Sequence, residues 1–95
     1  MNGKIEFSSA ANETFKSIQL QILNRWGPTT LATFERKTLR TLDLISQSPL
    51  IYQSVEGNDK VRKAVIHKNC SVFYEIKPTE IRILYFWDNR QEPIL

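Results

Sequence analysis

The hydrophobic and polar positions of this chain follow two different periods along its length. Near the start, Lys4-Ile5-Glu6-Phe7 alternates between polar and apolar residues, which predicts a short strand with Ile5 and Phe7 on one face. From Ala10 to Trp26 the apolar positions recur at spacings of three and four, which is typical of an amphipathic helix. These positions are Ala11, Phe15, Ile18, Ile22 and Trp26.

The helical period continues in a second segment after a break at Gly27-Pro28. Thr29 or Thr30 supplies the capping oxygen of this predicted helix, which ends before Pro49. Its repeating positions are Leu31, Phe34, Thr38, Leu42 and Ile45. Because only three or four residues join the two helices, we expect an antiparallel helical hairpin. Residues 50–59 then read as a crossover loop.

The rest of the chain predicts three consecutive strands. The segments Val61–His67, Cys70–Ile76 and Ile81–Trp87 are rich in β-branched and aromatic residues. A two-residue turn, Lys68-Asn69, joins the first pair, and Asn69 tolerates a left-handed backbone. The segment Lys77–Glu80 joins the second pair, with Pro78 preset for a turn. The sequence therefore predicts one α+β domain over residues 1–95: an N-terminal strand, a two-helix hairpin and a three-stranded antiparallel meander, with the helices on one sheet face.

The opposite face of this sheet has no element left to cover it. Regular alternation directs Val72, Tyr74, Ile76, Ile81, Ile83 and Tyr85 toward the helices, and Ser71, Phe73, Glu75, Arg82, Leu84 and Phe86 away from them. Phe73, Leu84 and Phe86 then form an apolar patch with a polar rim, which is typical of a protein-binding surface. An irregular strand that turns one of these rings inward is the alternative.

The composition excludes several classes of site. No stretch of about 18 apolar residues and no signal-peptide pattern at Met1–Phe7 is present in the sequence, so we expect a cytoplasmic protein without a membrane span. Cys70 is the single cysteine, and no cluster of His and Cys has metal-ligand spacing. We expect Cys70 to be a small strand-end residue, and we expect neither a metal nor a cofactor.

The charge is mildly basic and unevenly distributed. A formal net charge of +3 is far below that of a DNA-binding arm, so we expect no direct sequence-specific binding to DNA. The cations gather between Lys60 and Lys68, where no acidic residue interrupts them. This cluster is either the charged edge of a sheet that resists aggregation or a contact surface for an anionic partner.

In this order, the elements and several short segments resemble toxins of the RelE/ParE superfamily of type II toxin–antitoxin systems. The matching segments are Phe15 to Gly27, Leu42 to Pro49, Val61-Arg62, Val72 to Ile76 and Ile83 to Pro93. The resemblance covers nearly the whole chain and implies a small basic toxin that is kept silent by a cognate antitoxin. The partner-binding residues expected on this basis are Phe73, Leu84, Phe86, Arg62, Arg82 and Arg90.

Two activities divide this superfamily. RelE-like members cleave messenger RNA in the ribosome, which requires a base, an acid and cations around the phosphate. Arg62 fills one basic position of that branch, whereas Ala64 and Ser71 stand where further basic residues are expected. The tail after Asp88 offers Arg90 but neither Tyr nor His.

The remaining candidates do not complete a nuclease site. His67 is expected to flank a turn and to face away from Arg62. Arg62, Arg82 and Arg90 are the candidate catalytic cations, and no acid or base accompanies them. The sequence therefore favours a ParE-like toxin that binds DNA gyrase; a RelE-like ribosome-dependent nuclease and an inactive toxin that only binds its antitoxin are the alternatives.

Overall fold

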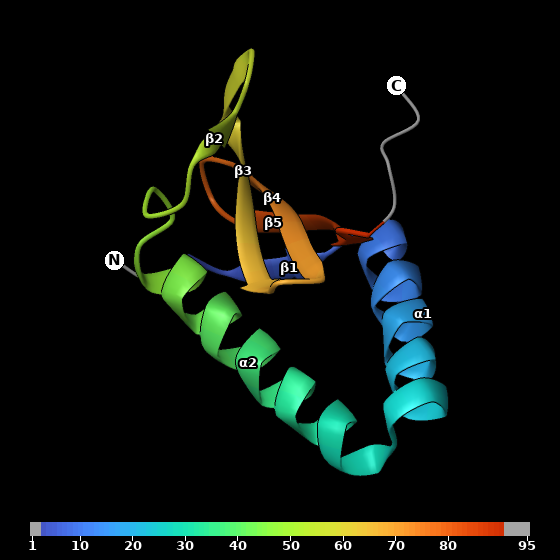
Figure 1. Ribbon diagram of the computed structural model, residues 1–95. Coiled ribbons are helices and arrows are strands. Elements are labelled where there is room, and N and C mark those ends of the chain that lie inside the picture. Colours follow the sequence, from blue (N-terminus) through green and yellow to red (C-terminus); the bar gives the residue numbers. More distant parts are fainter. Residues whose placement is uncertain (1–2, 91–95) are drawn as a thin grey trace.

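The computed structural model describes residues 3–90 and confirms the predicted α+β fold. The elements are β1 (Ile5–Phe7), α1 (Ser9–Trp26), α2 (Pro28–Gln47), β2 (Ser54–Val55), β3 (Asn58–His67), β4 (Cys70–Ile76) and β5 (Ile81–Asp88). The strands form one sheet in the order β1-β5-β4-β3-β2, and both helices lie on the same side of it (Figure 1). All pairs are antiparallel except β1–β5. The segment expected to be only a crossover loop thus contributes β2 and the first residues of β3.

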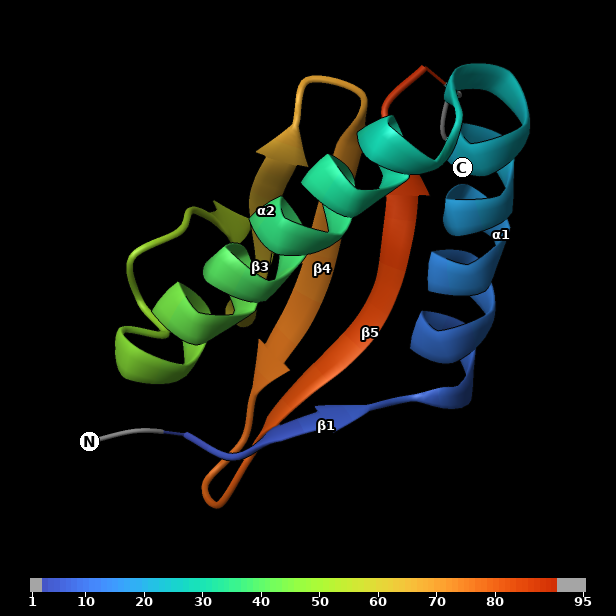
Figure 2. The same cartoon turned by 90° about the horizontal axis from the view of Figure 1, so that it is seen from below.

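The connection between the helices is shorter than predicted. Gly27 alone separates α1 from α2, and its φ of 92° is the left-handed conformation that glycine adopts without strain. Pro28 follows at the first helical position, where its missing N–H costs nothing, so the expected caps Thr29 and Thr30 lie inside α2. The helices open from Gly27 as a V, with α1 against β5 and α2 against β3 (Figures 1 and 2).

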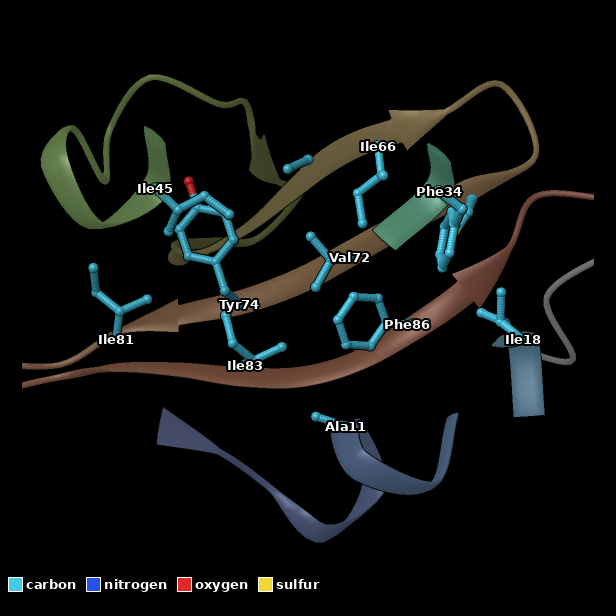
Figure 3. Packing of buried hydrophobic residues seen from close by; sticks show 12 residues of the cluster. Ala11, Ile18, Phe34, Ile45, Ile66, Val72, Tyr74, Ile81, Ile83 and Phe86 are labelled. Atoms are coloured by element: carbon cyan, nitrogen blue, oxygen red, sulfur yellow. The ribbon is translucent and has the colours of Figure 1, made fainter. Parts of the chain in front are cut away.

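The core lies between the helices and the sheet. Buried aromatic and aliphatic side chains from both layers meet there, as Figure 3 shows. They include Ile18, Phe34, Ile45, Val72, Tyr74, Ile83 and Phe86. The Tyr74 hydroxyl donates a 2.6 Å hydrogen bond to the Pro49 carbonyl, which fixes the segment after α2 against the sheet. Within residues 3–90, neither helix combines the length and the hydrophobicity that a bilayer-spanning segment needs.

One extra residue in β5 reverses the predicted facing of its second half. Phe73 is opposite Tyr85 and Tyr74 is opposite Ile83, so Leu84 has no partner in β4 and forms a β-bulge. Phe86 is therefore 2% exposed in the core, and its expected place on the uncovered face is wrong. Tyr85, which regular alternation directs toward the helices, lies on the uncovered face instead.

Side chains near the start of α1 satisfy the backbone of β5 around this bulge. Ser8 caps α1 by accepting a hydrogen bond from the Ala11 N–H at 2.9 Å, and its hydroxyl also donates to the Leu84 carbonyl at 2.7 Å. The Thr14 hydroxyl accepts from the Phe86 N–H at 2.9 Å. β1 pairs only with Ile81–Ile83, so these two hydroxyls provide the hydrogen bonds to the β5 backbone beyond the end of β1.

The hairpin turns use glycine only once. Gly57, with a φ of 86°, lies in the turn between β2 and β3. No described residue other than glycine has a positive φ, so the left-handed conformation that Asn69 tolerates is not used. The carbonyl of Asn69 instead accepts a 2.8 Å hydrogen bond from the Asn89 N–H, which joins the β3–β4 turn to the end of β5.

Candidate functional site

The uncovered face of the sheet carries a ridge of aromatic rings. Phe73 of β4 stacks on Tyr85 of β5 with ring centroids 4.8 Å apart, and Tyr85 meets Trp87 edge to face at 6.3 Å. The Lys63 ammonium lies 5.8 Å from the centre of the Phe73 ring. We call the surface formed by Lys63, Val65, Phe73, Arg82, Leu84, Tyr85 and Trp87 the open face. None of the described helices or loops packs on its aromatic ridge.

The open face thus keeps two of the three predicted apolar residues. Phe73 and Leu84 are partly exposed, and Val65 of β3 adds an apolar side chain that is 56% exposed. Ser71, expected to point outward, is fully buried and donates a 3.1 Å hydrogen bond to the Asn89 side-chain oxygen. An apolar ridge bordered by polar groups is the arrangement found at protein interfaces.

Arg62 does not belong to the open face. It is opposite Tyr74 in the β3–β4 pair, so it points to the helix side of the sheet. Its guanidinium donates to the Tyr52 carbonyl at 2.9 Å and to the Leu50 carbonyl at 3.4 Å, and its Nε is buried without a partner. Arg62 and Arg82, two of the candidate cations, therefore lie on opposite faces of the sheet. Its contacts anchor the segment between α2 and β2.

The other two candidate arginines are paired with nearby carboxylates. Arg82 on the open face contacts Glu80 at 3.1 Å. Arg90 binds Asp88 in a bidentate manner: its Nη2 donates to Oδ2 at 2.7 Å and its Nε donates to Oδ1 at 3.0 Å. This hydrogen bonding lowers the pKa of the Asp88 carboxyl. Arg62, Arg82 and Arg90 thus point to different surroundings, and the structure does not bring them together around one phosphate position.

A hollow lies on the helix side of the sheet, inside the closed end of the V. This space, which we call the helix cleft, has a volume of about 1060 Å³ and is enclosed by α1, α2, the β3–β4 turn and the end of β5. Its apolar residues are Ile18, Ile22, Trp26, Phe34 and Cys70, and its ionisable residues are Arg25, Lys37, His67, Lys68, Asp88 and Arg90.

His67 lies in this cleft beside Lys37 and flanks the β3–β4 turn, as predicted. The register shifts between Val65 and His67, so regular alternation does not hold at the end of β3 and the expected facing away from Arg62 is wrong. Burial, with the positive charges of Lys37 and Lys68, lowers the pKa of the imidazole. Its Nδ1 accepts the Asn69 N–H at 3.3 Å.

Cys70 is a buried strand-end residue, as predicted. Burial, with a smaller effect of Asp88, raises the pKa of its thiol to about 12. At neutral pH the sulfur is therefore protonated and weakly nucleophilic. Among residues 3–90, no three His, Cys, Asp or Glu side chains are grouped closely enough to hold a metal ion.

Sequence reasoning missed several residues of both surfaces. Tyr85 and Trp87 were not expected on the open face, because the consecutive apolar residues of β5 carry no clear period. The cleft residues Arg25 and Lys37 were missed because they lie on two different helices. Trp26 was predicted in the apolar stripe of the first helix, but it is 63% exposed and lines the cleft instead of the core.

The comparisons with known proteins identify the family. Residues 5–93 match the family model described as ParE toxin of the type II toxin–antitoxin system parDE. The fold resembles a chain of the chromosomal ParDE system from P. aeruginosa, with a TM-score of 0.76 and 15% identity over 90% of this chain and 95% of that chain.

Two further solved structures share the fold. A chain of the E. coli DinJ-YafQ toxin–antitoxin complex has a TM-score of 0.65 and 14% identity, covering 95% of this chain and 96% of that one. A chain of the RelBE2 toxin–antitoxin complex from Mycobacterium tuberculosis has a TM-score of 0.58 and 16% identity, covering 93% and 99%. No curated protein sequence matches the chain. The family match covers nearly the whole length, and this chain is therefore a member of the ParE toxin family of type II toxin–antitoxin systems.

Proposed function

We propose that this toxin arrests growth in the cytoplasm by binding DNA gyrase, and that a cognate antitoxin silences it by covering the open face. Membership of the ParE family supports the first part. The aromatic ridge of Phe73, Tyr85 and Trp87 supports the second, because a partly exposed apolar ridge between charged residues is stabilised when a partner removes it from water.

The placement of the arginines carries the choice against ribosome-dependent cleavage. A nuclease of the RelE kind needs cations converging on one phosphate, with an acid and a base beside them. Here Arg62 is engaged by loop carbonyls, Arg82 by Glu80 and Arg90 by Asp88. A protein that acts by binding alone needs no such convergence.

Two activity assays test the target. Purified toxin is expected to reduce supercoiling by gyrase or to make cleaved DNA accumulate. In a purified translation system, primer extension is expected to find no cleavage of ribosome-bound messenger RNA. Codon-aligned cleavage products would overturn the gyrase proposal, and silence of folded toxin in both assays would favour a toxin that only binds its antitoxin.

The antitoxin surface is tested by substitution. Phe73→Asp places a carboxylate in the ridge, and we expect it to weaken binding of the antitoxin encoded beside the toxin at least tenfold, about 1.4 kcal/mol. Leu39→Asp is the matched control, because Leu39 is 68% exposed on α2, away from the ridge. Calorimetry on folded variants measures both affinities. Equal affinities for Phe73→Asp and the wild type would refute the open face as the antitoxin site.

A further inference from the structure

The loop between α2 and β2 is fixed to the sheet by two side chains. The Tyr74 hydroxyl donates a 2.6 Å hydrogen bond to the Pro49 carbonyl. The Arg62 guanidinium donates to the Tyr52 carbonyl at 2.9 Å. We call residues 48–53 the anchored loop, and Figure 1 shows it connecting the end of α2 to β2. Because both ends of the loop are held by the sheet, its shape is set before any partner binds.

The anchored loop displays two large aliphatic side chains. Leu50 is 69% exposed and Ile51, which follows it, is 57% exposed. Side chains of this kind gain free energy when a partner covers them. Holding the loop also has a cost, because the Nε of Arg62 is buried without a hydrogen-bond partner, which destabilises the fold. A fixed surface loop with exposed aliphatic side chains is typical of a binding loop.

A small hollow beside Leu50 carries positive charge. Its volume is about 340 Å³, near the lower end of the roughly 300–1,000 Å³ typical of ligand pockets. Its apolar residues are Leu50, Ile76 and Pro78, and its charged residues are Lys60, Arg62, Lys77 and Asp59, which gives the lining a net charge of +2. We call this hollow the loop pocket. Within residues 3–90 no carboxylate pairs with Lys60, and Lys77 lies 3.9 Å from Glu75. The loop pocket therefore combines apolar walls with cations that an acidic partner can reach.

We infer that the anchored loop and the loop pocket form a contact surface for a protein that presents an apolar side chain flanked by carboxylates. Resting on the proposed function, the inference assigns this surface to gyrase. The apolar side chain of the partner packs on Leu50 and enters the pocket, and its carboxylates meet Lys60 and Lys77. A DNA backbone fits less well, because its phosphates match the cations but bring no apolar group to Leu50 and Ile51.

This surface is separate from the open face proposed for the antitoxin. Arg62, which holds the anchored loop, points to the helix side of the sheet, whereas Phe73 and Tyr85 lie on the other side. An antitoxin on the open face leaves the loop uncovered and blocks the approach of gyrase by its bulk. Substitutions in the loop are therefore expected to change gyrase binding without changing antitoxin binding.

Leu50→Asp tests the apolar part of this surface. The new carboxylate faces the cations of the loop pocket, so the fold is expected to tolerate it, while it repels the carboxylates of the partner. We expect binding to purified gyrase without DNA to weaken at least tenfold in surface plasmon resonance, and antitoxin affinity to stay unchanged. Leu39→Asp is the matched control, because Leu39 is 68% exposed on α2 outside the pocket lining. We expect it to leave both affinities unchanged.

Charge reversal tests the cations. Lys60→Glu is expected to weaken gyrase binding at least fivefold, with a smaller loss at high salt. Lys16→Glu is its control, since it makes the same charge change on α1 outside the pocket lining. A short DNA duplex serves as a second ligand. If Lys60→Glu weakened binding of the duplex and not that of gyrase, the pocket would be a phosphate site and the inference would be wrong.

A fluorescent label locates the contact directly. Gln53→Cys places a reactive thiol in the anchored loop, and labelling is selective because Cys70 is buried. We expect the emission of the label to shift when gyrase is added and to stay unchanged when the antitoxin is added. Lys16→Cys carries the label of the control protein, for which we expect no shift with gyrase.

The outcomes separate this inference from the proposed function. If the wild type binds gyrase, the inference is overturned by full gyrase affinity of folded Leu50→Asp, by an equal loss in Leu39→Asp, by a silent label at Gln53→Cys, or by an equal loss of antitoxin affinity in Leu50→Asp. Failure of the wild-type toxin to bind gyrase would instead overturn the proposed function, and the assignment of the anchored loop to gyrase with it.

Discussion

Replacing Phe86 by Ala tests the bulge at Leu84, on which the assignment of the two sheet faces depends. Phe86 is 2% exposed, and the centroid of its ring lies 4.8 Å from that of Phe15 and 5.9 Å from that of Phe7. Truncating a buried Phe to Ala costs about 3–5 kcal/mol, to which each lost aromatic pair contributes about 0.5–1.5. Phe73→Ala on the open face removes one ring stack from a side chain that is partly exposed, so we expect a smaller loss, about 1 kcal/mol.

Urea unfolding followed by far-UV circular dichroism measures both variants. The expected difference of at least about 2 kcal/mol corresponds to a gap of at least 8 °C in Tm for a domain of this size, at roughly 4–8 °C per kcal/mol. A domain of 95 residues has a modest stability to lose. Phe86→Leu therefore serves as a second variant, with an expected loss of about 1–1.5 kcal/mol.

The outcome that would refute this reasoning is specific. Under the regular alternation predicted from sequence, Phe86 is an exposed ring and Tyr85 a buried one. If Phe86→Ala cost less than about 1.5 kcal/mol, or no more than Phe73→Ala, the bulge and the facing of β5 would both be wrong.

Two further changes test other parts of the structure. Tyr74→Phe removes the 2.6 Å hydrogen bond to the Pro49 carbonyl, and we expect a loss of about 1–1.5 kcal/mol in urea unfolding, against no more than about 0.5 for the control Tyr52→Phe; equal losses would contradict the anchoring role. Burial, Lys37 and Lys68 depress the pKa of His67 below its ordinary 6.5, so folding disfavours the protonated imidazole and stability is expected to fall as pH decreases through 6.5. His67→Gln should remove this component of the pH dependence of Tm, and an unchanged profile would contradict it.

The regular elements could be predicted because their signals are local. The strand Cys70–Ile76 has the predicted bounds, because a polar turn lies at each of its ends. The first helix ends at Trp26 as predicted, because Gly27-Pro28 follows it. The helix α2 begins two or three residues earlier than predicted. Gly27 serves as the end of one helix and the cap of the next, and a sequence pattern does not distinguish this from a short loop.

The bulge could not be predicted from β5 alone. It is held by hydrogen bonds from Ser8 to Leu84 and from Phe86 to Thr14, across separations of 76 and 72 residues. The run from Leu84 to Trp87 is apolar or aromatic throughout, so it has no period that fixes which ring turns inward. The correct facing becomes visible only when α1 is placed beside β5.

The candidate sites divide in the same way. Phe73 was predicted on the open face because β4 alternates regularly, and Leu84 because the alternation of β5 holds up to the bulge that Leu84 forms. The cleft cations lie on α1, α2, the β3–β4 turn and the end of β5, and only Lys68 belongs to the basic cluster noted in the sequence. Side chains so far apart in the chain become neighbours through the fold, and charge counts along the sequence do not show this.

Two local irregularities thus account for the two surfaces. The extra residue Leu84 turns Phe86 into the core against α1 and leaves Tyr85 outside beside Phe73. The single-residue connection at Gly27 holds the helices close at one end while they spread apart toward the other (Figure 2). The cleft between them is also lined by Lys68 of the β3–β4 turn. The open face is mainly apolar and the helix cleft mainly cationic, so contacts at the first gain from the hydrophobic effect, whereas contacts at the second weaken as salt is added. A partner long enough to reach both sides of the sheet would therefore combine a salt-insensitive contact with a salt-sensitive one.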